Sequence, residues 1–255
     1  MNFKCILFEK EAPIAFIKLN RPQVLNAMNK IMWMEIQSAM ADVIADDTIR
    51  VLVFTGEGRA FSTGADLKES KTRTIEAYRD YLEYLQSVSL EIIRFEKPTI
   101  AAVNGYALGS GYELALACDI RIAAEDARIG SPEARVSSSA TGGAFRLLHD
   151  LIGPAKAREL LFTAENIDGR IAEKIGLVNK AVPKDRLMDA ACAMASKIAE
   201  NSSFSIKVLK QGLNMAANGK DMEALMDFEV EACLACVSSK ERLSALSHFE
   251  SRKKS

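Results

Sequence analysis

Short apolar segments alternate with long helical patterns along the first half of this chain, and this alternation limits the possible folds more than any other feature of the sequence. Residues 50–55, 99–103 and 119–123 are short, apolar and typical of buried strands. Apolar residues recur at helical spacing from about Asn26 to Ala45 and from about Thr74 to Phe95. Strand and helix in regular alternation are the order of a parallel α/β sheet, so we expect an α/β fold.

The two ends of the chain depart from this alternation. Residues 5–8 and 14–19 are short, rich in β-branched residues and separated by a polar turn, so they predict a β-hairpin. Beyond Gly142 nearly the whole sequence has helical periodicity, apart from one brief apolar run. We therefore expect an α/β core over residues 1–201 and an α-helical region over residues 202–255.

Composition and charge exclude several classes of protein. Of the 255 residues, 49% are hydrophobic and 26% are charged, which is typical of a soluble globular protein. The net charge of −1 gives no general attraction to nucleic acid or to an acidic membrane. Five scattered cysteines fit neither a disulfide scaffold nor a metal site. With no signal-peptide core and no stretch apolar enough to span a membrane, we expect a cytoplasmic protein without a membrane or nucleic-acid partner.

Three polar clusters each follow one of the predicted strands. Residues 61–69 read Phe-Ser-Thr-Gly-Ala-Asp-Leu-Lys-Glu, residues 104–114 carry the run Gly-Ser-Gly-Tyr-Glu, and residues 130–133 read Gly-Ser-Pro-Glu. Parallel α/β sheets place their ligand crevice at the carboxyl ends of their strands. We therefore expect the first two clusters to lie at a ligand site.

The second cluster has the features of a turn that stabilises negative charge. Gly109 and Gly111 flank Ser110 where a strand turns into a helix, so the backbone can approach a ligand closely. The unpaired N–H groups of a helix's first turn favour developing negative charge. A second donor from the turn at Gly64 and Ala65 would complete a two-amide oxyanion hole. Alternatively, the glycines only permit close packing of helix and strand.

Two glutamates are candidates for acid–base chemistry. Glu113 lies one turn into an otherwise apolar helix, where a buried carboxylate is rare without a partner or a chemical task. Alternatively, it is a favourable partner of the helix dipole. Glu133 follows a proline and is either a second catalytic group or a solvated loop residue. The spacing of the two residues leaves both interpretations open.

Taken together, these segments resemble the crotonase (enoyl-CoA hydratase/isomerase) superfamily. Residues 61–69 are similar to its F-x-x-G-A-D-[LI]-K-E segment, and residues 104–119 resemble N-G-x-[AC]-x-G-G-G-x-E-L-x-x-x-C-D. Residues 130–133 are similar to its G-x-P-E segment, and residues 19–27 resemble its opening L-N-R-P-x-x-L-N-A. The similarity runs in order over nearly the whole chain.

The resemblance implies a fold, an activity and an assembly. It implies a spiral α/β core of repeated β-β-α turns, followed by an α-helical C-terminal region used to form homotrimers or hexamers. The implied enzyme is a hydro-lyase of fatty acid metabolism, which adds water across the α,β double bond of an acyl-CoA thioester or removes it. The reaction that the resemblance implies needs no metal or redox cofactor. Coenzyme A is part of the substrate and is not a separate cofactor.

Motif positions also imply roles for particular residues. The backbone N–H groups of Ala65 and Ser110 would form the oxyanion hole for the thioester enolate. Glu113 would orient and deprotonate the attacking water, and Glu133 would protonate the α-carbon. The residues expected to contact the substrate are Val24, in a loop near its adenosine part, and Ala65, Asp66, Leu67, Lys68 and Ser110.

Two departures from the family pattern bear on these expectations. The middle glycine of the family's glycine run is Ser110 here, which we expect to be tolerated because only its N–H is used. In the segment after Glu133, which is about one residue shorter than in the family, Val-Ser-Ser-Ser-Ala-Thr-Gly-Gly of residues 136–143 replaces the family's G-x-x-P-G-x-G-G stretch and lacks its proline. This change is either loop drift or the sign of a cyclic or dienoyl acyl group in place of a straight chain.

Alternative functions follow from the same residues. Within the family, an enoyl-CoA isomerase would use Glu133 alone as a proton shuttle. An RNA-binding module would need a basic helix, and the helical pattern over residues 28–45 offers only Lys30. A subunit with an inactive site is disfavoured by the presence of both Glu113 and Glu133.

Overall fold

The computed structural model describes residues 3–239, 241, 242 and 246. Its core is a six-stranded sheet in the order β1-β2-β3-β5-β7-β9, in which every neighbouring pair is parallel except the antiparallel edge pair β1-β2. The predicted hairpin and the predicted parallel sheet are both confirmed. The strands are β1 (Ile6–Glu11), β2 (Ile14–Leu19), β3 (Val51–Gly56), β5 (Thr99–Val103), β7 (Ile120–Ala124) and β9 (Lys180–Val182).

A second, smaller parallel sheet pairs β4 with β6 and β6 with β8. Each of its strands follows a strand of the large sheet and precedes a helical segment, so the chain winds through repeated β-β-α turns. Asn104 ties two of these turns together, because its side-chain amide donates to the carbonyl oxygens of Gly56 at 2.8 Å and Gly58 at 3.1 Å. The strands are β4 (Ala60–Ser62), β6 (Tyr106–Leu108) and β8 (Arg128–Gly130).

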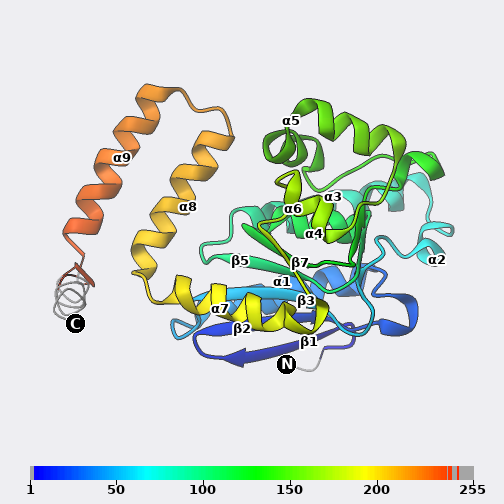
Figure 1. The fold of residues 1–255 in the computed structure, drawn as a ribbon, viewed down its shortest axis with the longest axis horizontal. Coiled ribbons are helices and arrows are strands. Elements are labelled where there is room, and N and C mark those ends of the chain that lie inside the picture. Colours follow the sequence, from blue (N-terminus) through cyan, green and yellow to red (C-terminus); the bar gives the residue numbers. More distant parts are fainter. Residues whose placement is uncertain (1–2, 240, 243–245, 247–255) are drawn as a thin grey trace.

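Helices cover both faces of the large sheet (Figure 1). Successive side chains of a strand point to opposite faces, so the continuous apolar run of β3 supplies two cores. Val51 and Val53 pack with helix α7 (Leu187–Ala199) on one face. Leu52 and Phe54 belong to the larger core on the other face. The helices of that larger core include α1 (Lys30–Ala45), α3 (Ile75–Ile93) and α4 (Ser110–Ala117).

Helix α1 begins later than the apolar periodicity predicts. Asn29 caps it by accepting a hydrogen bond from the N–H of Met32 at 2.9 Å. Asn26 lies outside the helix, has a φ of 57° and is fully buried, with its amide donating to the carbonyls of Glu57 and Ala60. The predicted start near Asn26 was therefore wrong, because a structured loop carries the first apolar residues of the pattern.

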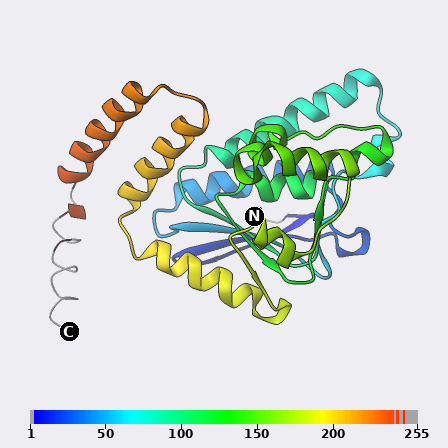
Figure 2. The ribbon, with the colours of Figure 1, turned by 45° about the horizontal axis from the view of Figure 1, so that its top comes forward.

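Helices α8 and α9 form a hairpin that stands away from the α/β body in both views (Figures 1 and 2). A partly buried ion pair joins the two parts, since Nζ of the buried Lys210 lies 2.7 Å from Oδ2 of Asp119. The division into residues 1–201 and 202–255 stays a prediction, and residues 247–255 lie outside the described part. The remaining helical segments are η1 (Pro22–Val24), α2 (Leu67–Ser70), η2 (Glu133–Val136), α5 (Ala144–Thr163), α6 (Gly169–Lys174), η3 (Lys184–Arg186), α8 (Ser203–Ala217) and α9 (Met222–Val237).

None of the helices in the described part of the chain has both the length and the apolar character needed to cross a membrane.

Candidate active site

A cavity of about 860 Å³ lies where β4 and β6 end. Residues from the η1 loop, α2, α3, the start of α4 and the η2 loop line it. The structure thus gathers in one place every residue that the sequence predicts for the site, and their chemical roles stay predictions at this point. These residues are Val24, Ala65, Asp66, Leu67, Lys68, Ser110, Glu113 and Glu133.

Two tight turns meet at the floor of this cavity. Gly64 follows β4 and has a φ of 94°. A β-carbon on Gly64 would lie only 2.8 Å from the carbonyl oxygen of Leu108 and 3.3 Å from the backbone nitrogen of Ser110. Only a glycine permits this approach, and it places the peptide of Ala65 beside the first turn of α4.

The local backbone pairing does not bond the N–H group of Ala65 to Met28 or the N–H group of Ser110 within α4. Ser110 is the first residue of α4, so its N–H has no partner within the helix. Ala65 forms an isolated parallel bridge with Met28. Its neighbours make the hydrogen bonds of that bridge, because Met28 donates to Gly64 at 2.8 Å and Asp66 donates to Met28 at 3.0 Å. The Ala65 N–H is therefore turned away from Met28.

The two glycines of the α4 start have different uses. Gly109 has a φ of 51° and a ψ of −127°, which favours glycine, and a β-carbon on it would lie 2.6 Å from Oε1 of Glu133. The carboxyl group of Glu133 therefore lies directly against the N-terminus of α4. A β-carbon on Gly111 would lie 2.5 Å from the carbonyl oxygen of Ser62, so Gly111 permits close packing of α4 on β4.

Glu113 is only 2% exposed, and both of its carboxylate oxygens are bound by Thr141. Its Oε1 accepts a hydrogen bond from the N–H of Thr141, and its Oε2 accepts one from the hydroxyl of Thr141 at 2.7 Å. Burial raises the pKa of Glu113 and the charge of Glu133 raises it further, while the hydrogen bonds from Thr141 act to lower it. This environment is that of a buried, hydrogen-bonded carboxylate and not that of a surface carboxylate at a helix dipole.

Glu133 opens the 3₁₀ helix η2 and is half-buried. The hydroxyl of Ser131, which is itself buried, donates to Oε2 of Glu133. Since its carboxyl group lines the cavity and contacts the start of α4, Glu133 is not a freely solvated loop residue.

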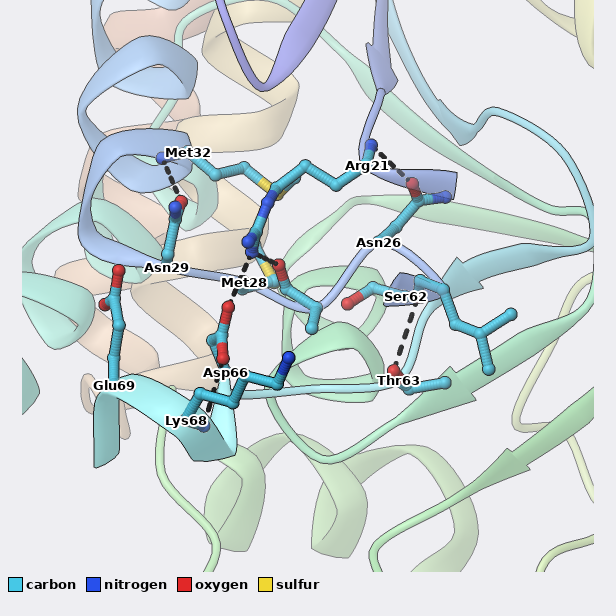
Figure 3. A network of polar contacts seen from close by, with 12 residues as sticks. Arg21, Asn26, Met28, Asn29, Met32, Ser62, Thr63, Asp66, Lys68 and Glu69 are labelled. Atoms are coloured by element: carbon cyan, nitrogen blue, oxygen red, sulfur yellow. Dashed lines mark hydrogen bonds and ion pairs between the residues drawn. The ribbon is translucent and has the colours of Figure 1, made fainter. Parts of the chain in front are cut away.

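The carboxylate of Asp66 is already used by the protein (Figure 3). It accepts a hydrogen bond from Nη1 of Arg21 at 2.9 Å, and it caps α2 by accepting one from the N–H of Lys68 at 3.1 Å. Burial acts to raise the pKa of Asp66, but the hydrogen bonds from Arg21 and Lys68 outweigh it and lower that pKa. Asp66 thus shapes the turn, and it leaves the exposed side chains of Leu67 and Lys68 at the cavity's edge.

Sequence patterns did not single out Thr141 or Ser131. Thr141 lies 28 positions beyond Glu113, and only the course of the loop before α5 brings the two together. The one signal in the sequence is that Thr141 belongs to the segment 136–143, where the chain departs from the family pattern. Ser131 lies inside a matched motif at a position that the motif leaves variable.

Solved structures share the whole fold of this chain. A 1.8 Å crystal structure of an enoyl-CoA hydratase from Bacillus anthracis superposes with a TM-score of 0.94 at 31% identity, covering 98% of this chain and 97% of that one. An enoyl-CoA hydratase from Thermoplasma volcanium superposes with a TM-score of 0.89 at 30% identity, covering 96% and 97%. The chain is therefore an α/β protein of the crotonase fold class, with further helices at its C-terminal side, as predicted.

Sequence comparison defines the family. The model of the enoyl-CoA hydratase/isomerase family matches residues 9–255. A short-chain-enoyl-CoA hydratase from Clostridium acetobutylicum is 36% identical over 100% of this chain and 97% of its own length. A crotonyl-CoA hydratase from Syntrophomonas wolfei is 34% identical over 100% and 98%. The chain belongs to the enoyl-CoA hydratase/isomerase family, so the predicted crotonase membership and the predicted hydratase type of enzyme are confirmed.

Proposed function

We propose that this protein hydrates the α,β double bond of a short-chain enoyl-CoA thioester. The observation that carries the proposal is that Glu113 and Glu133 line one cavity together with the turns that present the Ala65 and Ser110 N–H groups. Crotonyl-CoA is the substrate to test first, because the names of two relatives refer to short-chain enoyl-CoA and crotonyl-CoA.

The two N–H groups would stabilise the enolate. When the oxygen of water bonds to the β-carbon, the electron pair of the double bond moves toward the thioester oxygen, which becomes negative. Donors fixed at Ala65 and Ser110, with the dipole of α4 behind the second, would stabilise that charge without rearranging. Loss of one such donor typically slows a reaction by about 10²–10³-fold.

The two glutamates would move the protons. Glu113 would take a proton from the attacking water, and its raised pKa makes it a stronger base than an exposed glutamate. Glu133, entering the reaction with a proton on its carboxyl group, would give that proton to the α-carbon as the electron pair returns from the thioester oxygen to form the new C–H bond. One proton transferred from Glu113 to Glu133 then restores the starting state. All these groups belong to the chain, so the steps need no metal or redox cofactor.

We propose that the substrate lies along the loop that follows β4. The exposed ammonium group of Lys68 gives the cavity's edge a positive charge suited to the phosphates of coenzyme A. Val24 of η1 lines the same cavity and would lie against the adenosine part. Asp66, whose carboxylate is paired with Arg21, would contribute the shape of the loop and not a charge.

We further propose a homotrimer or hexamer in the cytoplasm. Large apolar side chains are exposed along α8 and α9, which favours their burial against other copies of the chain. The five cysteines are all free, which is consistent with a reducing compartment.

The decisive experiment follows the loss of the enoyl-thioester absorbance band with crotonyl-CoA, beside a cyclic dienoyl-CoA. We expect turnover of crotonyl-CoA, and a rate about 10²–10⁴-fold lower in both Glu113→Gln and Glu133→Gln. Glu159→Gln, which alters an exposed glutamate on α5, should keep the wild-type rate.

Other results would favour the alternatives. Turnover of the cyclic substrate alone would mean that residues 136–143 select a different acyl group. Migration of a double bond that survives in Glu113→Gln, without hydration by the wild type, would indicate an isomerase. No turnover of any of these thioesters would overturn the proposal.

A further inference from the structure

We propose that Thr141 is a positioning residue, whose hydroxyl keeps Glu113 in one orientation and in its ionised form for attack on water. This role rests on the proposed hydratase function. It adds to the two glutamates and the two backbone donors a side chain that does not itself touch the reacting atoms.

The first support is the way in which Thr141 holds Glu113. One residue donates to both carboxylate oxygens, its N–H to Oε1 and its hydroxyl to Oε2 at 2.7 Å. A carboxylate bound through both oxygens cannot rotate without breaking a hydrogen bond, so its remaining lone pairs keep one direction. Because Glu113 is 2% exposed, solvent offers little replacement for a lost bond.

The second support is electrostatic. A hydrogen bond donated to a carboxylate favours its charged form, and burial and a neighbouring negative charge oppose that form. Burial raises the pKa of Glu113, and so does Glu133 of η2 whenever it is ionised, while Thr141 and the hydroxyl of Ser110 lower that pKa. Besides η2, the main elements packed against α4 are α3, α5, β4 and β6. Their buried side chains are uncharged, with Tyr81 of α3 the titratable one.

The third support is that the loop has an anchor independent of the Thr141 hydroxyl. The N–H of Gly142 donates to Oε1 of Gln86 on α3 at 2.7 Å. Gly142 has a φ of 59°, and a β-carbon on it would lie 3.0 Å from Cβ of Glu113. The backbone of residues 141 and 142 is thus fixed against Glu113 from both sides, and a substitution of the threonine side chain removes one hydrogen bond while leaving the loop in place.

The test compares Thr141→Val, which replaces the hydroxyl with a methyl group of similar size, with the wild type across pH. A general base must be ionised, so the rate falls as pH drops through its pKa. Loss of the hydroxyl raises the pKa of Glu113, and we expect the acidic limb of the kcat profile for crotonyl-CoA to move up by about one pH unit. The rate should recover at higher pH, and KM should change little.

Two further variants separate positioning from a purely structural effect. Thr141→Ser keeps the hydroxyl and should restore the wild-type profile. Thr163→Val makes the same exchange on the exposed surface of α5, where the hydroxyl donates to the carbonyl of Glu159 and accepts from the N–H of Glu165, and should leave the profile unchanged. If Thr141→Val folds poorly, Thr141→Ala removes the same hydroxyl and gives the same readout.

An unchanged acidic limb in the hydroxyl-free variants would overturn the role of Thr141, and so would a Thr141→Ser variant with the same defect as Thr141→Val. The proposed function would still hold after either result, provided that the wild type hydrates crotonyl-CoA and Glu113→Gln does not. Absence of hydration by the wild type is the separate failure of the proposed function.

Discussion

The chemistry of this site depends on single backbone positions that cannot carry a side chain. Gly109 combines a left-handed φ of 51° with a carboxyl oxygen of Glu133 at 2.6 Å from the place of a β-carbon. A side chain there must displace Glu133 and the start of α4, including the N–H of Ser110. Misplacement by about 1 Å can cost about 10²-fold in rate, so we predict at least that loss of kcat in Gly109→Ala with crotonyl-CoA.

The matched control is Gly219, which lies between α8 and α9. It also has a positive φ, 74°, but a β-carbon on it would meet nothing within 4 Å. Gly219→Ala should therefore cost about 1 kcal/mol of unfolding free energy from backbone strain and leave kcat unchanged. Equal losses of activity in Gly109→Ala and Gly219→Ala would show that contact with Glu133 is not the cause.

The charge of the buried Glu113 carboxylate should destabilise the folded protein at neutral pH. The pKa of Glu113 in the folded protein lies above the ordinary glutamate value of 4.5. Between these two pKa values the folded state binds more protons than the unfolded state, so the free energy of unfolding falls as pH rises through this range. Glutamine has no charge to bury and can still bond Thr141. We predict that Glu113→Gln resists urea better than the wild type at pH 8, and that the difference shrinks toward pH 4. A difference independent of pH would contradict this origin.

The sequence could identify the site residues that belong to motifs, but not those that act through the fold. Glu113 and Glu133 stand at motif positions, and their types alone suggest acid–base chemistry. Thr141 has no such signal, because a threonine in a serine-rich loop is ordinary until the loop brings it to Glu113. Asp66 also stands at a motif position and lines the cavity, but the motif does not reveal that its carboxylate binds Arg21, and its contact with substrate stays a prediction.

At the level of helices and strands, length decided what could be predicted. The central strands β3, β5 and β7 are continuous apolar runs, and the sequence locates them to within about two residues. The strands of the small sheet have only three residues each, too few for a periodic pattern. They form because each follows a strand of the large sheet and pairs with the corresponding strand of the next β-β-α turn. This pairing depends on the fold of the whole chain and not on the local sequence. The site lies at these unpredicted strands.

Lys210 is the most buried of the side chains that bond α8 to the α/β body, beside Lys207 and Asn214. Its side chain is 10% exposed, and Nζ donates to Asp119 at 2.7 Å and to the carbonyl of Lys97 at 3.3 Å. Hydrogen bonds with charged groups in such places contribute about 1.5–3 kcal/mol. We predict that Lys210→Met lowers the urea unfolding free energy by about 2 kcal/mol at fixed protein concentration and speeds amide exchange in α8.

The control for this prediction lies one turn away on the same helix. Lys207 pairs with Glu96 at 2.8 Å but is 37% exposed, and such surface pairs contribute less than about 1 kcal/mol. Lys207→Met should therefore leave the exchange of α8 close to that of the wild type. Similar effects of Lys207→Met and Lys210→Met would mean that charge alone, and not the burial of Lys210, holds α8.

The described part of the molecule leaves one large surface without an internal partner. Apolar residues recur every three or four positions along α9, and two more lie one turn apart on α8, so each helix has an apolar stripe in contact with water. Neither stripe is needed to join the hairpin to the body, because the Lys210 ion pair and the chain connection do so. The exposed apolar residues of the two helices are Leu209, Leu213, Met222, Met226, Val230, Leu234 and Val237.

A stripe of this kind is stable in water when another copy of the chain covers it. If the proposed trimer or hexamer buries α9, a charge in the middle of the stripe must either lose water or separate the subunits. Val230 is 58% exposed and lies near the centre of α9. We predict that the wild type sediments as three or six copies and that Val230→Glu shifts it to smaller species.

The control is Lys220→Glu in the exposed turn between α8 and α9, which changes the charge outside the stripe and should keep the wild-type mass. A wild type that sediments as a single chain at micromolar concentration, or a Val230→Glu variant of unchanged mass, would show that the subunits do not meet through this stripe.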